Sequence, residues 1–185
     1  VIDQETNGGD LVSDAIYASV EDCDVAFINA GSIRSNLAPG AITRGMILKM
    51  LPYENRLCSV KISGANLQKL FDIIARSYPN HLGNLLHPSG LRYIVKKGVK
   101  ATDIQVMNRY KNCYEPIHPD QLYTVVSTEF NLRDKTYEDV FLKNSGITEY
   151  KTLYSEALIN YIEQILHGKI GVQYSRPQHR IIFRD

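Results

Sequence analysis

Apolar residues near the start of the chain recur at the spacing of an α-helix. The apolar stripe over residues 9–21 comprises Leu11, Val12, Ala15, Ile16, Ser19 and Val20. This spacing predicts a helix buried on one side, with Asp14 and Glu21 on its wet face. Residues 24–28 then form a continuous apolar run bounded by turn residues, which predicts a short buried strand and a loop after it.

Two more helices are predicted in the first half of the chain. A short helix is predicted over residues 42–51, with Thr43 as its opening residue. It ends before Pro52, because proline disfavours helical geometry in the residue before it. Ser63 is a suitable N-cap for a helix over residues 65–77. Its inner face carries Leu67, Leu70, Phe71 and Ile74. Residues 57–62 between these helices alternate apolar and polar, which is typical of a strand.

The second half of the chain favours strands. Residues 78–90 mix Pro, Asn, Gly and His, so we expect a surface loop there. Short β-rich segments at 91–95, 103–107 and 122–128 predict three strands, and residues 180–183 a last one. A long helix is predicted over residues 151–166, which would bury Leu153, Ala157, Ile162 and Ile165. The order of elements predicts an α+β fold, a single mixed helix-and-sheet domain with one continuous core.

Composition narrows the classes of protein. A chain of 185 residues with 44% hydrophobic and 22% charged residues is typical of one soluble globular domain. A formal net charge of +1 argues against nucleic acid as a partner. No apolar run is long enough for a transmembrane segment, and the first residues show no basic region followed by an apolar run. The compartment stays open on these grounds.

Catalytic patterns are hard to find in this sequence. The five histidines are scattered at positions where we expect solvated side chains: His81, His87, His118, His167 and His179. They lack metal-binding spacings, and no nucleophile elbow or phosphate-binding glycine loop of the dinucleotide or Walker kind occurs. Cys23, Cys58 and Cys113 are widely spaced, so we expect Cys58 in the core, Cys113 as a free thiol and no metal knuckle.

The loop after the first predicted strand is a better candidate for binding. Asn29 can donate and accept hydrogen bonds, and Arg34 offers a planar fork for a phosphate or a ribose oxygen. The small residues between them let a ligand approach the backbone. A second loop carries Tyr53 directly after Pro52.

Ordered motifs along nearly the whole chain resemble one family. Residues 5–15 read ETNGGDLVSDA, 28–34 read INAGSIR, 41–43 read AIT, 51–55 read LPYEN, 62–67 read ISGANL and 180–182 read RII. In this order they are similar to the motifs E-x-N-x-G-N-L-x-x-D-A, N-G-G-x-I-R, x-I-T, L-P-F-x-N and L-T-G-x-x-L and the closing segment of the 5'-nucleotidase C-terminal domain.

The resemblance implies that residues 1–185 form a domain that binds the nucleoside part of a nucleotide. Asn29 and Arg34 match the polar ligand contacts, and Tyr53 and Phe130 match two aromatics that sandwich the base. By the same resemblance, a separate metallophosphoesterase domain, in the same precursor or in another chain, holds two divalent metals and performs the hydrolysis. We therefore expect no catalytic residue, metal or other cofactor in this chain, and export to the periplasm or cell surface.

Three departures from the family pattern leave a rival interpretation open. Gln4 stands where many members have an arginine, and Ala30 replaces a glycine, where its methyl group would crowd a close ligand. The motif G-G-D-G, whose aspartate holds the ribose, is absent after Phe130, and Asp134 or Asp139 is a possible substitute. The rival to nucleotide binding is a scaffold module that kept the fold and lost the ligand. An independent phosphatase is the least favoured alternative.

Overall fold

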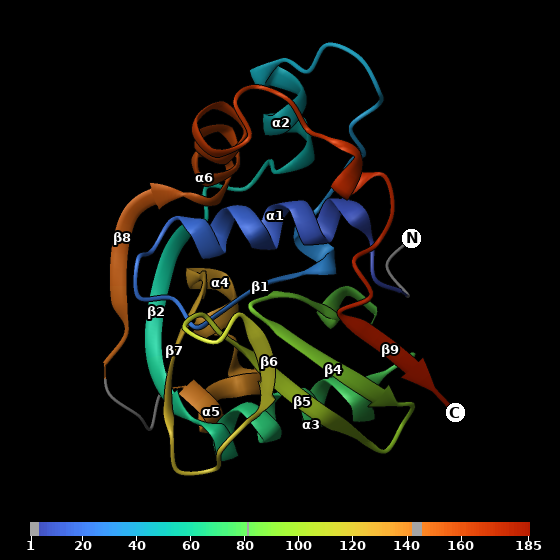
Figure 1. Cartoon of the computed structure of the whole chain (residues 1–185), viewed down its shortest axis with the longest axis vertical. Helices are drawn as coiled ribbons and strands as arrows, with labels where there is room; N and C mark the ends of the chain where they lie inside the picture. Colours follow the sequence, from blue (N-terminus) through green and yellow to red (C-terminus); the bar gives the residue numbers. More distant parts are fainter. Residues whose placement is uncertain (1–3, 81, 142–145) are drawn as a thin grey trace.

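A five-stranded mixed sheet forms the centre of the computed structural model, which describes residues 4–80, 82–141 and 146–185. In spatial order its strands are β3 (Leu86–Ser89), β1 (Val25–Asn29), β7 (Leu122–Thr128), β2 (Arg56–Ser63) and β8 (Thr148–Leu153). β1 runs parallel to β7 and antiparallel to β3, whereas β2 runs antiparallel to both β7 and β8. Figure 1 shows this sheet between α1 (Asn7–Ala18) above and α3 (Gly64–Ser77) below.

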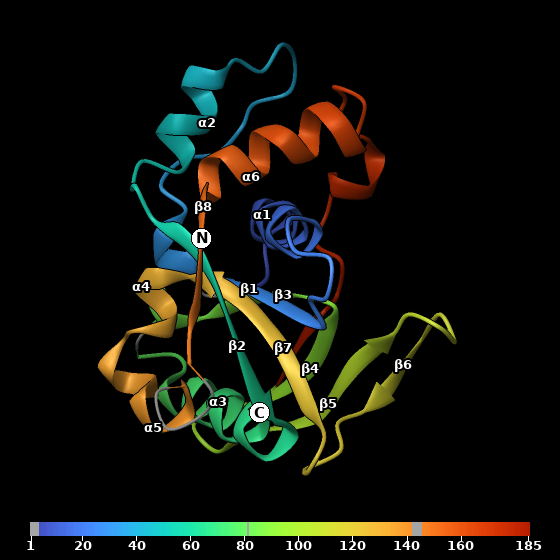
Figure 2. The ribbon, with the colours of Figure 1, turned by 90° about the vertical axis from the view of Figure 1, so that its left-hand side faces the viewer.

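Both faces of the central sheet are buried, because successive side chains of a strand point to opposite faces. Val25 and Phe27 of β1 join one hydrophobic cluster, and Ala26 and Ile28 join another. Helices α1, α2 (Arg44–Met50) and α6 (Tyr154–Asn160) supply the second cluster. Helices α3 and α5 (Glu138–Phe141) and a smaller sheet supply the first (Figure 2). The predicted α+β class is confirmed, but the prediction of one continuous core is wrong, since the sheet separates two clusters.

The first three helices each begin at a side-chain cap. They are α1 (Asn7–Ala18), α2 (Arg44–Met50) and α3 (Gly64–Ser77). Thr6 accepts the N–H of Gly9, and Thr43 and Ser63 accept N–H groups in the same way, which satisfies donors that a helix leaves free. The predictions for Thr43 and Ser63 are confirmed. α1 ends earlier than predicted, and Asp14 lies in an ion pair instead of on a wet face.

The smaller sheet has four strands and includes the end of the chain. In spatial order its strands are β6 (Cys113–Pro116), β5 (Lys100–Asn108), β4 (Leu91–Lys96) and β9 (Ile181–Arg184). The strands predicted at 91–95, 103–107 and 180–183 are confirmed, whereas β6 was not predicted. β9 pairs in parallel with β4, and the β5–β6 hairpin projects from the body (Figure 2). Cys58 is buried and Cys113 is exposed, as expected.

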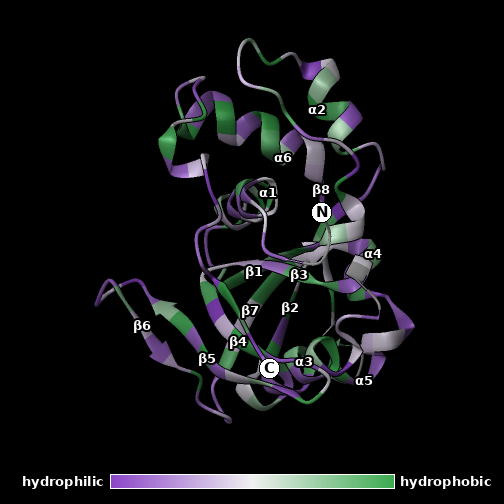
Figure 3. Ribbon diagram, turned by 90° about the vertical axis from the view of Figure 1, so that its right-hand side faces the viewer, coloured by the Kyte–Doolittle hydropathy of each residue, from purple (hydrophilic) through white to green (hydrophobic). Residues whose placement is uncertain are grey.

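The helix predicted over residues 151–166 begins later than expected. Its first residues belong to β8, and the helix comprises α6 (Tyr154–Asn160) and one π-helical turn, η4 (Tyr161–Ile165). Leu153 is therefore a half-buried N-cap and Ile165 is 57% exposed, whereas Ala157 and Ile162 are buried as predicted. Figure 3 shows alternating hydrophobic and hydrophilic bands along α6, above α1.

The predicted surface loop over residues 78–90 contains a buried strand instead. All four residues of β3 are buried against β1, and Pro88 is tolerated because β3 lies at the edge of the sheet. His87 is 1% exposed, so the expectation of a solvated side chain is wrong there. His81 lies outside the described residues.

Short elements complete the chain. They are the 3₁₀ turns η1 (Ala30–Ser32), η2 (Leu82–Asn84), η3 (Lys135–Tyr137) and η5 (Val172–Tyr174), and the helices α4 (Glu129–Leu132) and α5 (Glu138–Phe141). η1 follows β1 directly and α4 follows β7 directly, so two of these short elements lie at one end of the central sheet.

Candidate functional site

The strand pairing brings the predicted ligand residues to one end of the central sheet. β1 is parallel to β7, with Ala26 opposite Val126, so the carboxyl ends of both strands meet at this end. β2 is antiparallel to β7, with Leu57 opposite Thr128, so β2 begins there. Asn29 ends β1, the loop with Tyr53 leads into β2, and Phe130 lies in α4 directly after β7, so the three residues adjoin the same end of the sheet although they are far apart in the sequence.

Asn29 is largely occupied by contacts within the protein. Its Nδ2 donates to the carbonyl oxygen of Gly83 at 3.2 Å, and its Oδ1 accepts from Ser32 Oγ at 2.5 Å. These bonds tie η1 to η2, where a Cβ atom on Gly31 would lie 3.2 Å from the same Gly83 oxygen. The side chain of Ala30, which replaces the family's glycine, is buried in a core cluster.

Arg34 presents its guanidinium group at the surface beside these loops. Its backbone N–H donates to the carbonyl oxygen of Met50 at 2.8 Å, which attaches the first loop to the end of α2. Its Nη1 donates to the carbonyl oxygen of Gly31 at 3.3 Å. The side chain is exposed, and other N–H groups of the guanidinium remain for an anion.

Tyr53 and Phe130 expose aromatic surface at the same end of the sheet. Tyr53 is 47% exposed and Phe130 is 54% exposed, although each lies beside well-buried segments. Such aromatic surface is available for stacking against a planar ligand. Tyr53 precedes β2 in the sequence, and Phe130 follows β7.

Both aspartates considered for ribose recognition already have partners within the protein. Asp134 Oδ1 accepts the N–H of Thr136 at 2.7 Å and caps η3. Asp139 Oδ2 lies 3.9 Å from Lys69 Nζ of α3. Both carboxylates thus have local structural partners. Gln4, which replaces the family's arginine, is exposed before α1.

Residues that hold the aromatics were missed from the sequence. Tyr154 OH accepts the N–H of Tyr53 at 3.2 Å. Thr128 caps α4, and Asn131 Nδ2 donates to Ser127 Oγ at 2.9 Å directly beside Phe130. The Thr128 cap had a local signal, because threonine before a short helix is typical of an N-cap, but the Tyr154 contact spans 101 residues.

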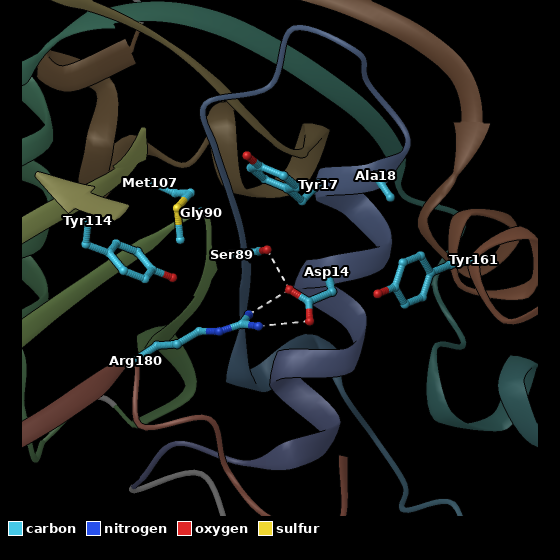
Figure 4. A pocket seen from close by; sticks show the side chains of 9 residues that line it. All are labelled: Asp14, Tyr17, Ala18, Ser89, Gly90, Met107, Tyr114, Tyr161 and Arg180. Carbon is cyan, nitrogen blue, oxygen red and sulfur yellow. Dashed lines mark hydrogen bonds and ion pairs between the residues drawn. The ribbon is translucent and has the colours of Figure 1, made fainter. Parts of the chain in front are cut away.

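A polar hollow lies elsewhere on the molecule and is lined by none of the four predicted residues. It has a volume of about 330 Å³, and Figure 4 shows the residues that line it. Asp14 Oδ1 lies 2.8 Å from Arg180 Nη1, and Asp14 Oδ2 accepts from Arg180 Nη2 at 2.9 Å. Ser89 and Tyr174 also donate to this carboxylate, at 2.5 and 2.7 Å.

The ion pair in this hollow is structural. Burial disfavours the charge of Arg180, but the hydrogen bonds and charge of Asp14 outweigh burial and raise the pKa of Arg180 above its ordinary value. The carboxylate of Asp14 already accepts three hydrogen bonds and makes a further ion-pair contact with Arg180 Nη1, so little capacity remains for a ligand. The loop end with Arg34 and the two exposed aromatics is therefore the better candidate site.

Metal ligands do not cluster in the part of the chain that the structure describes. No three His, Cys, Asp or Glu side chains among those residues gather as a metal site. The described residues therefore do not fit a two-metal centre. None of the described helices has the length and apolar character to cross a bilayer.

Sequence comparison relates most of the chain to known proteins. The sequence model of the 5'-nucleotidase C-terminal domain matches residues 2–143. An apyrase of Tabanus yao is 32% identical over 116 residues, which cover 57% of this chain and 21% of the apyrase. An apyrase of Anopheles gambiae is 28% identical over 165 residues, which cover 84% of this chain and 28% of that protein. This chain thus spans less than a third of the length of these relatives.

Solved structures share the fold. The 5'-nucleotidase precursor from Thermus thermophilus superimposes with a TM-score of 0.87 at 21% identity. The match covers 100% of this chain and 37% of the Thermus thermophilus chain. The NAD nucleotidase of Haemophilus influenzae gives a TM-score of 0.83 at 18% identity, with 97% of this chain and 33% of that chain covered. At these identities the likeness establishes the fold.

Proposed function

Because this chain belongs to the family of 5'-nucleotidase C-terminal domains, we propose that residues 1–185 bind a nucleotide or nucleoside as part of a 5'-nucleotidase-type phosphohydrolase. One observation carries the proposal. Tyr53 and Phe130, about half exposed, adjoin the same end of the central sheet as the exposed guanidinium of Arg34. Two aromatic faces and one cation suit a planar base attached to a phosphate.

In this proposal the base stacks between Tyr53 and Phe130, and Arg34 faces the phosphate. Stacking on each aromatic contributes about 1 to 3 kcal/mol. The expected affinity of the chain alone for adenosine or AMP is millimolar to high micromolar, or roughly 4 to 6 kcal/mol, because half of a shared site supplies part of the contacts.

The hydrolysis itself is assigned to a separate domain. C-terminal domains of this family usually accompany an N-terminal metallophosphoesterase domain, and this chain covers 37% of the Thermus thermophilus protein. Two divalent metals in such a domain would activate the attacking water and stabilise charge on the phosphate. The residues of this chain would bind and orient the nucleoside. Export to the periplasm or cell surface is part of the same proposal.

Titration of the isotope-labelled chain with adenosine and AMP tests this function. Saturable NMR shifts are expected in residues 29–34, 51–55 and 128–131. Tyr53→Ala and Phe130→Ala should each weaken binding by about fivefold or more, because each removes one stacking face. Tyr110→Ala is the matched control, since Tyr110 is a fully exposed aromatic on the β5–β6 hairpin. If saturating nucleotide leaves all three segments unshifted, the proposal is wrong.

The scaffold alternative has a specific observation in its favour. The amide of Asn29 already bonds to Gly83 and Ser32, and Asp134 and Asp139 have local partners. A domain that has lost its ligand would keep such internal bonds. Under this alternative the titration shows no saturable shift, and Tyr53→Ala behaves like the wild type.

A further inference from the structure

The loop that carries Tyr53 has no regular hydrogen bonding of its own. Residues 51–55 connect α2 to β2, and the structure assigns them no helix or strand. Leu51 is buried at the beginning of the loop, while Pro52, Tyr53 and Glu54 are exposed. A loop of this kind needs contacts from elsewhere to hold one conformation.

Tyr154 supplies two such contacts from the beginning of α6. Its hydroxyl oxygen accepts the N–H of Tyr53 at 3.2 Å. Its backbone N–H donates to the carbonyl oxygen of Asn55 at 3.1 Å. One residue therefore bridges both ends of the segment that presents the Tyr53 ring.

The position of Tyr154 is itself well determined. The side chain is fully buried in the hydrophobic cluster that α1, α2 and α6 supply. The preceding residue, Leu153, pairs with Arg56 at the beginning of β2, so α6 begins at the sheet end where the Tyr53 loop lies. Burial raises the pKa of Tyr154 to about 12, so the phenol stays protonated at neutral pH.

We propose that Tyr154 is a positioning residue for the nucleoside site, which holds the backbone of Tyr53 and Asn55 so that the Tyr53 ring faces the base. The inference rests on the proposed function. Tyr154 lies beyond the residues that the family model matches, 2–143, and after the last of the predicted ligand residues. Its role follows from its contacts in this structure, and a rigid support of this kind is what a stacking residue on a loop requires.

Tyr154→Phe in the full chain tests the inference, because it removes the hydroxyl and keeps the buried ring. Loss of one neutral hydrogen bond to the loop should weaken adenosine binding about three- to tenfold. Tyr150→Phe is the matched control. It removes a hydroxyl that lies 3.0 Å from Ser59 Oγ on the neighbouring strand, and it should leave adenosine affinity unchanged.

A double-mutant cycle separates positioning from a general loss of stability. If Tyr154 acts through Tyr53, Tyr154→Phe should change adenosine affinity less than about twofold in a Tyr53→Ala background. An equal loss in both backgrounds overturns the inference, and so does a Tyr154→Phe variant that binds like the wild type.

Hydrogen exchange in the ligand-free chain makes the result independent of nucleoside binding. The amide of Tyr53 should exchange faster in Tyr154→Phe than in the wild type or in Tyr150→Phe. Unchanged exchange at Tyr53 overturns the inference even if adenosine binds. If the wild type binds no nucleoside, both the proposed function and the positioning role are wrong. Faster exchange of the Tyr53 amide in Tyr154→Phe would then show only that Tyr154 holds the loop.

Discussion

At the scale of single residues, the first turn of α1 has two adjacent glycines with opposite constraints. A Cβ atom on Gly9 would lie 2.3 Å from Cγ of the buried His87 ring, whereas on Gly8 the nearest atom is the flexible end of Met50 at 3.3 Å. We expect Gly9→Ala to lower the free energy of unfolding by about 1 to 3 kcal/mol through overpacking.

The neighbouring substitution is the control for this prediction. Gly8→Ala should leave stability unchanged or raise it by roughly 0.5 to 1 kcal/mol, because alanine favours a helix over glycine. Urea denaturation followed by circular dichroism measures both variants. Equal stability changes in the two variants would contradict the packing of His87 against Gly9.

Asp10 is the buried residue with the clearest pH dependence. Its Oδ2 accepts the N–H of Gln178 at 2.9 Å, and its Oδ1 has no hydrogen-bond partner among the described residues. Burial first, and then the charge of Glu5, raise the pKa of Asp10 to about 7, although Arg180 opposes the shift. Asp14 also raises this pKa slightly.

Because the pKa of Asp10 is raised in the folded state, its ionisation destabilises the fold as pH increases from about 4 to about 7. Asp10→Asn removes that charge and keeps the shape. It should therefore raise the free energy of unfolding by about 1 to 3 kcal/mol at pH 8, with the gain disappearing toward pH 4. Denaturation of both proteins across this range measures the difference, and a gain independent of pH would refute the assignment.

At the scale of elements, the C-terminal segment is held on α1 by a nearly buried ion pair. Arg180 donates to Asp14 of α1 and, through Nη1, to the carbonyl oxygen of Pro88 in β3 at 2.8 Å. Its backbone N–H and that of Ile181 donate to Glu5. Arg180→Gln should lower the free energy of unfolding by about 3 kcal/mol or more, because it leaves Asp14 unpaired.

An exposed ion pair on the same segment provides the comparison. Lys97 Nζ lies 2.8 Å from Asp185 Oδ1 at the surface. Lys97→Gln should leave the denaturation midpoint unchanged within error, since water screens such pairs. If both variants lose the same stability, the Asp14–Arg180 pair does not hold the segment.

The sequence predicts elements well where the periodicity is long, and less well where tertiary pairing decides. The 14 residues of α3 and the cap at Ser63 show a clear helical pattern, and the prediction was right there. β3 has only four residues, among them His87 and Pro88, and its burial comes from β1 beside it and α1 above it. The first three residues of the helix predicted over 151–166 belong to β8 instead. β8 forms by pairing with β2, which lies about 90 residues earlier in the sequence, so no local pattern indicates this strand.

In the candidate site, too, features with a local sequence pattern were predicted and features set by tertiary contacts were not. Arg34 and Tyr53 were selected from their residue types in two predicted loops, whereas Phe130 was selected only from the resemblance to the family. Their supports, such as Tyr154, were not, because a phenol that accepts a backbone N–H 101 residues away leaves no local pattern. The internal use of the Asn29 amide was also invisible, since it depends on η2 lying against η1.

At the scale of the whole molecule, the proposed function divides the binding surface and the chemistry between this chain and a metallophosphoesterase domain. The candidate site lies at one end of the central sheet, with Arg34 and both aromatics exposed to solvent. A second domain facing this end would enclose the nucleoside and place the phosphate at its own metals. Purified chain should therefore hydrolyse neither nucleotides nor a generic phosphate ester, with or without added divalent metal, in a phosphate-release assay. Metal-dependent turnover that survives repurification would contradict this division.

Arg34 gives the division its sharpest test, because a guanidinium beside the phosphate stabilises charge only where the reaction occurs. The chain is combined with the proposed metallophosphoesterase partner, and AMP hydrolysis is followed by phosphate release. Arg34→Ala should lower kcat/KM of the mixture by about tenfold, corresponding to the loss of one charge-assisted hydrogen bond of roughly 1.5 kcal/mol. It should change adenosine binding by the chain alone much less, since adenosine carries no phosphate. Arg184→Ala, which removes an equal charge from the exposed end of β9, should leave both measurements unchanged. If Arg34→Ala matches the wild type in the mixture, or if it weakens adenosine and AMP equally, the guanidinium does not face the phosphate.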